Sequence, residues 1–194
     1  MSKTDAKLIL INGLPGVGKT TLQTQLAKDL NLPTMGKDTI KEFLFDQLGV
    51  RDREWSRVLG VAAIDMLHIL AEQLVASGQT LIIENAFYKN FAAPQFKELS
   101  EKYGVPILEV YCFTDDETRI RRYKERVISG RRHPGHADFE NFESLGSEQA
   151  VRKYLPLEIG EVIQYDTTAP SESDYKQLLS QIRHFLATRH TKGA

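Results

Sequence analysis

Cysteine is nearly absent from the chain: Cys112 is the single thiol among 194 residues. One thiol excludes an internal disulfide and a metal site built from several cysteines. The residues beside it, Val110, Tyr111 and Phe113, are apolar or aromatic. We therefore expect Cys112 to be a buried packing residue in a strand.

Long apolar runs and an excess of one charge are missing too. The longest early apolar run, Leu8 to Ile11, is far shorter than the roughly 20 residues of a membrane-spanning helix. The 25 Lys and Arg residues nearly balance the 26 Asp and Glu residues, which argues against a general nucleic-acid coat. We expect one globular domain spanning residues 1–194, cytoplasmic and without a membrane partner.

The sequence also lacks repeats and low-complexity tracts, and short apolar runs alternate with stretches of helical spacing. The runs predict strands at Lys7–Asn12, Pro33–Lys37, Gln79–Glu84, Pro106–Phe113 and Glu161–Tyr165, and the spacing predicts helices at Thr20–Leu30, Thr39–Leu48, Trp55–Ser77, Ala93–Tyr103, Asp115–Ser129 and Asp174–Thr188. This alternation predicts an α/β fold, with a parallel sheet covered on both faces and functional sites beyond the carboxyl ends of its strands. At two helix starts, Thr114 with Glu117 and Ser171 with Asp174 have capping-box spacing.

A glycine-rich segment follows the first predicted strand and leads directly into a helix. It fits G-x-x-x-x-G-K-[ST] with Gly13, Leu14, Pro15, Gly16, Val17, Gly18, Lys19 and Thr20. Glycines allow backbone amides to wrap a polyphosphate, and the helix start adds positive potential. Lys19 can then neutralise the β- and γ-phosphates, Thr20 can ligate Mg²⁺, and Thr21 follows in the same turn. The segment predicts a protein that binds ATP with Mg²⁺.

Two classes of phosphate-loop protein fit the sequence poorly. A GTPase needs N-K-x-D to read its base, and no asparagine here is followed by lysine. The segment Asp46–Gly49 does fit D-x-x-G, but it falls in a predicted amphipathic helix. A mechanical ATPase needs more chain for its coupling elements, so small phosphotransferases remain the favoured class.

Further motifs narrow the class: Lys37 and Asp38 after the second predicted strand, Glu84 and Asn85 after the third, Arg119-x-x-Arg122-x-x-x-Arg126, and Arg131 to Gly135. With the phosphate loop, they resemble the P-loop kinase family, in the branch with polynucleotide 5′-hydroxyl kinases, chloramphenicol phosphotransferase and zeta toxins. The resemblance implies a three-layer P-loop NTPase fold with a five-stranded parallel sheet in the order 2-3-1-4-5. It also implies a mobile arginine-bearing lid at roughly residues 119–147.

Asp38 stands where a hydroxyl acceptor would meet the transferred phosphoryl. By similarity to the family it is the candidate base that orients the acceptor, a role worth about 10²–10⁴ in rate. Because Asp38 directly precedes a predicted helix, capping that helix is the alternative role. Lys41, one turn on, could reach an anionic acceptor or be a solvated helix lysine.

Glu84 ends a strand that resembles a Walker-B strand, whose usual acid is Asp. The extra methylene suits contact with Mg²⁺ through water, or contact with the acceptor. The alternative is a carboxylate that faces solvent. Asn85 could donate a hydrogen bond to the acceptor, or be a turn residue.

Basic residues concentrate in the predicted lid. On one helical face lie Arg119, Arg122 and Arg126, whose mutual repulsion a triphosphate would relieve. We expect Arg122 and Arg126 to contact phosphate and stabilise the transferred charge. Phosphate contact and solvation remain open for Arg119 and Arg132, and solvation is expected for Arg121 and Lys124. A metal site at His133, His136 and Asp138 is not expected, because the loop offers too few spaced ligands.

Two pockets are also implied. By the resemblance, Tyr165 to Thr168 lies beside the adenine base. We expect the helix from Trp55, with Phe87, Tyr88 and Phe91, to form the acceptor wall. We predict an ATP-dependent kinase that phosphorylates a hydroxyl of a small-molecule or nucleoside-like acceptor. A polynucleotide 5′-hydroxyl kinase and a non-catalytic nucleotide-binding regulator remain alternatives, and the oligomeric state is open.

Overall fold

The structure, a computed structural model, describes residues 5–130, 132–136 and 152–188. Arg131, Asp138 and the predicted lid from residue 137 to 147 lie outside the described residues. The described part of the chain contains all five predicted strands and all six predicted helices.

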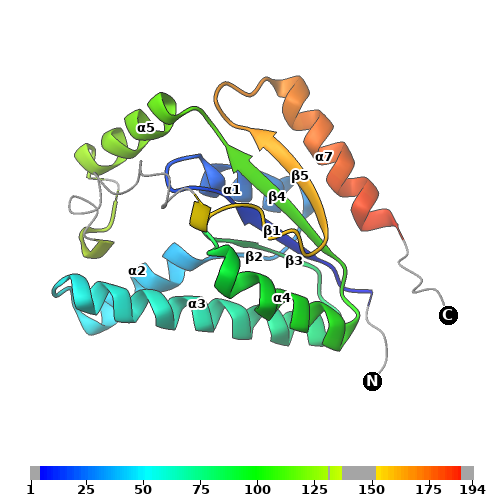
Figure 1. The fold of residues 1–194 in the computed structure, drawn as a ribbon, viewed down its shortest axis with the longest axis horizontal. Coiled ribbons are helices and arrows are strands. Elements are labelled where there is room, and N and C mark those ends of the chain that lie inside the picture. The colour runs from blue at the N-terminus through cyan, green and yellow to red at the C-terminus, as the bar shows by residue number, and fades with distance from the viewer. Residues whose placement is uncertain (1–4, 131, 137–151, 189–194) are drawn as a thin grey trace.

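A single five-stranded parallel sheet forms the centre of the molecule, with the strands in the order β2-β3-β1-β4-β5 (Figure 1). The strands are β1 (Leu8–Asn12), β2 (Thr34–Gly36), β3 (Leu81–Glu84), β4 (Ile107–Phe113) and β5 (Glu161–Asp166). Every residue of β1 and β3 is buried. Strands covered on both faces are continuously apolar, which explains why these short runs signalled strands so clearly. The predicted α/β class and the strand order are confirmed.

Helices cover both faces of the sheet, which makes three layers. The helices are α1 (Lys19–Leu30), α2 (Lys37–Leu48), α3 (Arg53–Ala76), α4 (Lys89–Tyr103), α5 (Asp116–Ile128) and α7 (Glu172–Ala187), with a 3₁₀ turn, η1 (Pro134–His136). One core cluster joins α2, α3 and α4 to the sheet, and the other joins α1 and α7 to its opposite face. In Figure 1, α5 and η1 lie apart from both layers, beyond the end of the sheet that carries the phosphate loop. The described part of the predicted lid, α5 and η1, therefore lies beyond the carboxyl ends of the strands.

Several predicted boundaries and one predicted cap differ from the structure. Helix α4 begins at Lys89, four residues before the predicted start. Pro94 lies inside the helix and removes one backbone donor, but it does not end the helix. Helix α2 begins at Lys37 with Gly36 as its N-cap. At α5, Asp115 and not Thr114 caps the helix, since its carboxylate accepts a hydrogen bond from the Thr118 amide at 2.7 Å. The predicted capping box at Ser171 and Asp174 is confirmed.

Helix α3 is the one helix in the described ranges with the length and apolar composition to cross a membrane. One of its faces buries Leu59 and Leu67 against the core. The opposite face leaves Val58, Val61 and Ile69 more than half exposed. Met66 is also on the surface, at 46% exposure.

Candidate active site

The phosphate loop joins β1 to α1 in a backbone conformation that depends on glycine. Gly13 has φ 135° and Gly18 has φ 90°, both in the region that side chains disfavour. A Cβ at Gly13 would lie 2.2 Å from the carbonyl oxygen of Cys112. Cys112 itself is fully buried, as predicted, and burial raises the pKa of its thiol to about 12. The neighbouring strand therefore leaves no room for a side chain at the first glycine.

Lys19 and Thr20, which begin α1, both contact Glu84 at the end of β3. The Lys19 Nζ lies 3.8 Å from Glu84 Oε1, and the Thr20 hydroxyl donates to Glu84 Oε2 at 3.2 Å. The Lys19 ammonium also donates to the Leu14 carbonyl at 3.0 Å. Glu84 is only 7% exposed, so it is not the solvent-facing carboxylate of the alternative interpretation.

Burial shifts the pKa values of both Lys19 and Glu84. Burial raises the pKa of Glu84, partly offset by the charge of Lys19, and lowers the pKa of Lys19, partly offset by Glu84. Carboxylate and hydroxyl oxygens are the protein ligands that Mg²⁺ accepts. The oxygens of Thr20 and Glu84 thus fit the predicted metal directly or through a water.

Asp38 lies in the first turn of α2 and bears two cationic partners. Its carboxylate accepts hydrogen bonds from Lys37 at 2.9 Å and from the Arg132 guanidinium at 2.6 Å. Asp38 does not cap the helix, because Gly36 occupies the N-cap and no side chain bonds there. Burial alone would raise the pKa of Asp38, but the Lys37 and Arg132 charges outweigh it and hold the pKa well below its usual range. Asp38 is therefore a permanent carboxylate near neutral pH.

Arg132 belongs to a short segment that docks on α2. We call the described residues 132–136 the lid clamp. The His133 ring stacks on Phe45 with centroids 5.3 Å apart, and its Nε2 lies 3.2 Å from Asp46 Oδ1. The buried His136 places its Nε2 2.8 Å from Glu42 Oε1.

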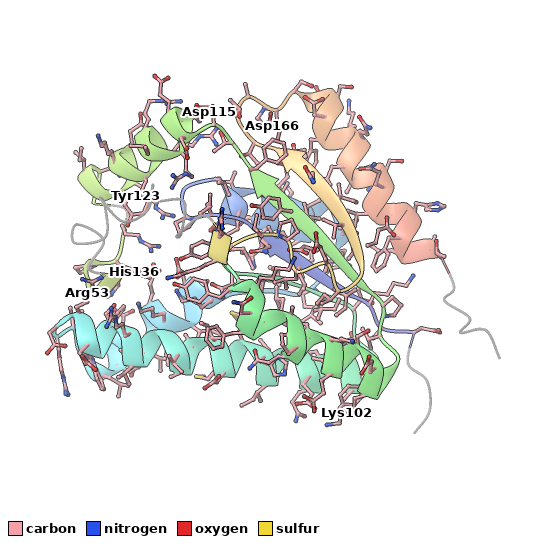
Figure 2. The ribbon with its side chains drawn as sticks, in the orientation of Figure 1. Arg53, Lys102, Asp115, Tyr123, His136 and Asp166 are labelled. Carbon is pink, nitrogen blue, oxygen red and sulfur yellow. The ribbon has the colours of Figure 1, made fainter. Side chains whose placement is uncertain are left out.

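The clamp also makes contacts that leave little free space. A Cβ at Gly135 would lie 2.5 Å from the Phe45 ring, so only glycine fits there. The Gly135 carbonyl accepts a hydrogen bond from the Ser56 hydroxyl on α3 at 3.0 Å. The clamp thus bridges α2 and α3, and Figure 2 shows His136 beside the end of α3 that carries Arg53.

The three arginines predicted to share one face of α5 lie in different surroundings. Arg122 donates to the carbonyls of Thr167 and Thr168 at 2.8 and 2.9 Å. Arg119, 2% exposed, is paired with Asp116 at 2.8 Å and packs beneath Gly16. Arg126 lies over the Tyr123 ring at 5.9 Å, and its charge contributes to lowering the pKa of Lys19, which burial chiefly lowers.

Two predicted acceptor residues are buried. Lys41 is 7% exposed and donates to the Ser56 hydroxyl at 2.9 Å, so it is not the solvated helix lysine of the alternative interpretation. The backbone N–H of Asn85 donates to the Ile11 carbonyl at 3.2 Å, which holds the chain in place where β3 ends. Of the predicted aromatic wall, Phe87 is buried, whereas Tyr88 and Phe91 are 43% and 74% exposed.

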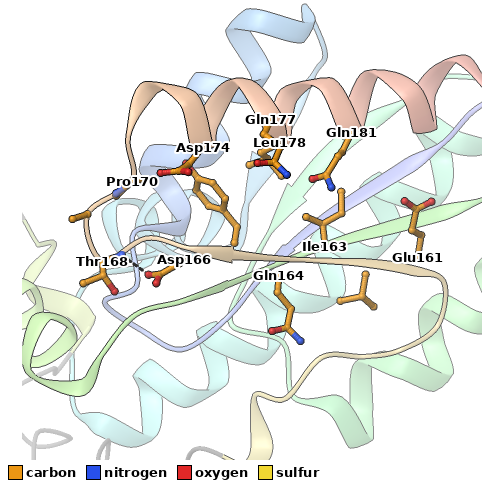
Figure 3. Close-up of a pocket in the computed structure, with 13 residues that line it drawn as sticks. Glu161, Ile163, Gln164, Asp166, Thr168, Pro170, Asp174, Gln177, Leu178 and Gln181 are labelled. Carbon is orange, nitrogen blue, oxygen red and sulfur yellow. Dashed lines mark hydrogen bonds between the residues drawn. The ribbon is translucent and has the colours of Figure 1, made fainter.

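The predicted adenine segment lies against the phosphate loop. The Thr167 hydroxyl donates to the Val17 carbonyl at 2.6 Å, and the Thr167 amide donates to the Phe113 carbonyl at 2.8 Å. Beside it, a cavity of about 710 Å³ opens between β5 and α7. Figure 3 shows Asp166 and Thr168, joined by a hydrogen bond, at one end of this cavity.

Two buried polar residues near the loop were missed. Asn12 is the last residue of β1, and Glu109 lies within β4; they are 0% and 1% exposed, and Asn12 Nδ2 donates to Glu109 Oε1 at 2.7 Å. The signal was present in the sequence, because each interrupts an otherwise apolar strand. Buried polar groups of this kind need hydrogen-bond partners, and these two residues bond to each other.

The chain is similar to one protein family and to several solved structures. The family model AAA_33, described as an AAA domain, matches residues 8–149. A crystal structure of a "putative kinase" from Chloroflexus aurantiacus J-10-fl shares 34% identity, covers 93% of this chain and 98% of that protein, and has a TM-score of 0.82. A sugar kinase from Janibacter sp. HTCC2649, at 16% identity, with coverage of 95% of this chain and 99% of that one and a TM-score of 0.57, is alike in fold alone. No curated protein matches the chain. The chain thus belongs to the AAA_33 family, a family of P-loop kinase-like proteins.

Proposed function

We propose that the protein is an ATP- and Mg²⁺-dependent kinase that transfers the γ-phosphoryl group to a hydroxyl of a small-molecule or nucleoside-like acceptor. The observation that carries the proposal is the convergence of Lys19, Glu84 and Asp38 at one edge of the sheet. Glu84 lies 3.8 Å from Lys19, and the charges of Glu84 and Asp38 both act on the Lys19 ammonium. Nucleotide, metal and acceptor groups would then meet at one place.

Each of these residues has a distinct part in the proposed reaction. Lys19 binds the β- and γ-phosphates, and Thr20 with Glu84 holds the metal. When bound, Mg²⁺ neutralises charge on the phosphates. Arg126, whose charge acts on Lys19, and Arg122, at the edge of the phosphate loop, would stabilise charge on the transferred group.

Asp38 orients the acceptor hydroxyl and receives its proton late in the transfer. A carboxylate with a lowered pKa is a weak base toward a free hydroxyl. The hydroxyl becomes far more acidic as its oxygen bonds to phosphorus, and the largely dissociative transition state demands little early proton removal. A permanent carboxylate at Asp38 therefore suits orientation better than early deprotonation.

The charges around Asp38 favour a neutral acceptor over a polynucleotide. Lys37 and Arg132 are both paired with Asp38, and Lys41 is paired with Ser56. A strand of nucleic acid needs several cations for its phosphates. In the described ranges, both cations that contact Asp38, and Lys41 one turn further along α2, are thus already bonded to protein partners.

A labelled-phosphate assay separates the three candidate functions. The protein is incubated with γ-labelled ATP, Mg²⁺ and a panel of nucleosides, sugars, antibiotics and 5′-hydroxyl oligonucleotides. Label in a small molecule supports the proposal, and label in an oligonucleotide identifies a polynucleotide kinase. Nucleotide binding without any labelled product would point to a non-catalytic regulator.

A further inference from the structure

Asn12 connects two backbone amides at the edge of the candidate site. Its Oδ1 accepts hydrogen bonds from the Gly13 amide at 2.7 Å and from the Phe87 amide at 3.0 Å. Gly13 is the first residue of the phosphate loop, and Phe87 lies in the connection from β3 to α4. One side-chain oxygen therefore fixes both connections to each other.

Glu109 holds Asn12 from the other side and reaches a third segment. Its Oε1 accepts from Asn12 Nδ2 at 2.7 Å, while its Oε2 accepts from the Leu157 amide at 2.7 Å and the Glu158 amide at 3.4 Å. Residues 157 and 158 lie between the predicted lid and β5. Glu109 thus ties the chain that returns from the lid to the residue that precedes the phosphate loop.

The direction of these hydrogen bonds is fixed by chemistry. An ionised carboxylate only accepts, so the Asn12 amide must turn its NH₂ toward Glu109. Its oxygen then faces Gly13 and Phe87, which both donate. A glutamine at position 109 would offer a single acceptor oxygen to donors on two sides, and no flip of the Asn12 amide would satisfy all of them.

Packing alone does not explain a glutamate at this place. Glu109 is 1% exposed, and its strand neighbours Leu108 and Val110 are fully buried apolar residues. Burying a carboxylate costs free energy unless hydrogen bonds compensate it, and an apolar residue of similar size would avoid that cost. Burial raises the pKa of Glu109, and the bonds from Asn12, Leu157 and Glu158 oppose that shift.

We propose that Asn12 and Glu109 form a positioning relay, which holds the first amide of the phosphate loop and the segment at 157–158 in a fixed relative position. This position in turn determines the affinity for the nucleotide polyphosphate. The ligand named here rests on the proposed function. The relay itself is a property of the free protein. Neither residue is a catalytic residue, because each acts through backbone groups of other segments.

Amide hydrogen exchange on the free protein tests the positioning. In Glu109→Gln, the Gly13 and Phe87 amides should exchange at least tenfold faster than in the wild type, although Glu109 does not touch them. The core amides of β1 and β3 should keep their protection, which distinguishes a local effect from general destabilisation. Glu101→Gln, the same chemical change at an exposed site on α4, should leave all these rates unchanged.

Calorimetric titration with ATP tests the consequence. Glu109→Gln and Asn12→Ala should each weaken binding about tenfold, and the double variant should be no weaker than the worse single variant, because both break one relay. Wild-type affinity in Glu109→Gln, unchanged Gly13 exchange, or fully additive losses would overturn the inference. If one variant does not fold, the other still supplies the exchange and affinity measurements. Should the wild type bind no nucleotide, the proposed function fails, while the exchange rates still decide whether the relay exists.

Discussion

The guanidinium of Arg132 lies 2.6 Å from the carboxylate of Asp38, so a residue of the predicted lid directly contacts the residue proposed to orient the acceptor. If Asp38 orients the acceptor as proposed, Arg132 acts on the acceptor through this contact. The lid clamp also contacts Glu42, Phe45 and Asp46 on α2, and it accepts one hydrogen bond from Ser56 on α3. The lid clamp and α2 form one docked unit in this structure.

Loss of Arg132 should affect the acceptor more than the nucleotide. Arg132→Ala removes a charge that holds Asp38 in place, so we expect kcat/KM for the acceptor to fall by about 10–100-fold, corresponding to roughly 1.4–2.8 kcal/mol. The dissociation constant for ATP should stay within about twofold of wild type. Arg121→Ala, which removes an exposed arginine paired with Glu125, serves as the control. A large loss of ATP affinity with unchanged acceptor kinetics would place Arg132 at the nucleotide.

Substitutions at Lys19 and Asp38 should separate nucleotide binding from transfer. Lys19→Ala removes the phosphate-loop cation and should abolish both. Asp38→Asn keeps the size of the side chain but removes the carboxylate, so it should abolish transfer and leave ATP binding intact. Titration calorimetry and a labelled-phosphate assay measure the two properties. Full turnover by Asp38→Asn would refute its proposed role.

The acid limb of the pH profile should belong to Glu84. Burial raises the pKa of Glu84, so it becomes protonated at a higher pH than an ordinary glutamate and loses its metal-holding charge as the pH falls. Asp38 has a lowered pKa and stays ionised over the same range. We expect kcat/KM to decline on acidification in the wild type, and Glu84→Gln to have lower activity without that decline. An acid limb that survives in Glu84→Gln would assign it to another group.

Gly135→Ala should loosen the lid clamp. The added methyl would lie 2.5 Å from the Phe45 ring, and overpacking of this kind costs about 1–3 kcal/mol. We expect a lower Tm and faster proteolytic cleavage near the clamp. In a Phe45→Ala background the same change should cost much less, because the obstructing ring is gone. Equal costs in the two backgrounds would contradict the observed contact.

The sequence predicted the fold well because its signals are local. The glycine and lysine positions of the phosphate loop, the apolar strands and the capping box at Ser171 each lie within a few adjacent residues. Predicted boundaries failed where a side chain's preference was ambiguous, as at Pro94 inside α4 and at Asp115 before α5. The branch of the kinase family stays a prediction.

Side-chain partners across long sequence separations could not be predicted. Helical spacing placed Arg119, Arg122 and Arg126 on one face, but it does not reveal that Arg122 meets the carbonyls after β5. Lys41 was similarly ambiguous, because its burial depends on Ser56 of the following helix. These contacts depend on how segments pack in three dimensions, which periodicity does not encode.

The docking of the lid clamp on α2 has a practical consequence for protein engineering. The clamp contacts Asp38, Glu42, Phe45 and Asp46, which lie along one side of α2. The residues on that side of α2 must therefore fit the clamp as well as any acceptor. A chimaera that imports α2 from a relative with another acceptor would carry mismatched contacts for the resident clamp. A chimaera that folds and functions should therefore require α2 and the lid clamp to be exchanged together.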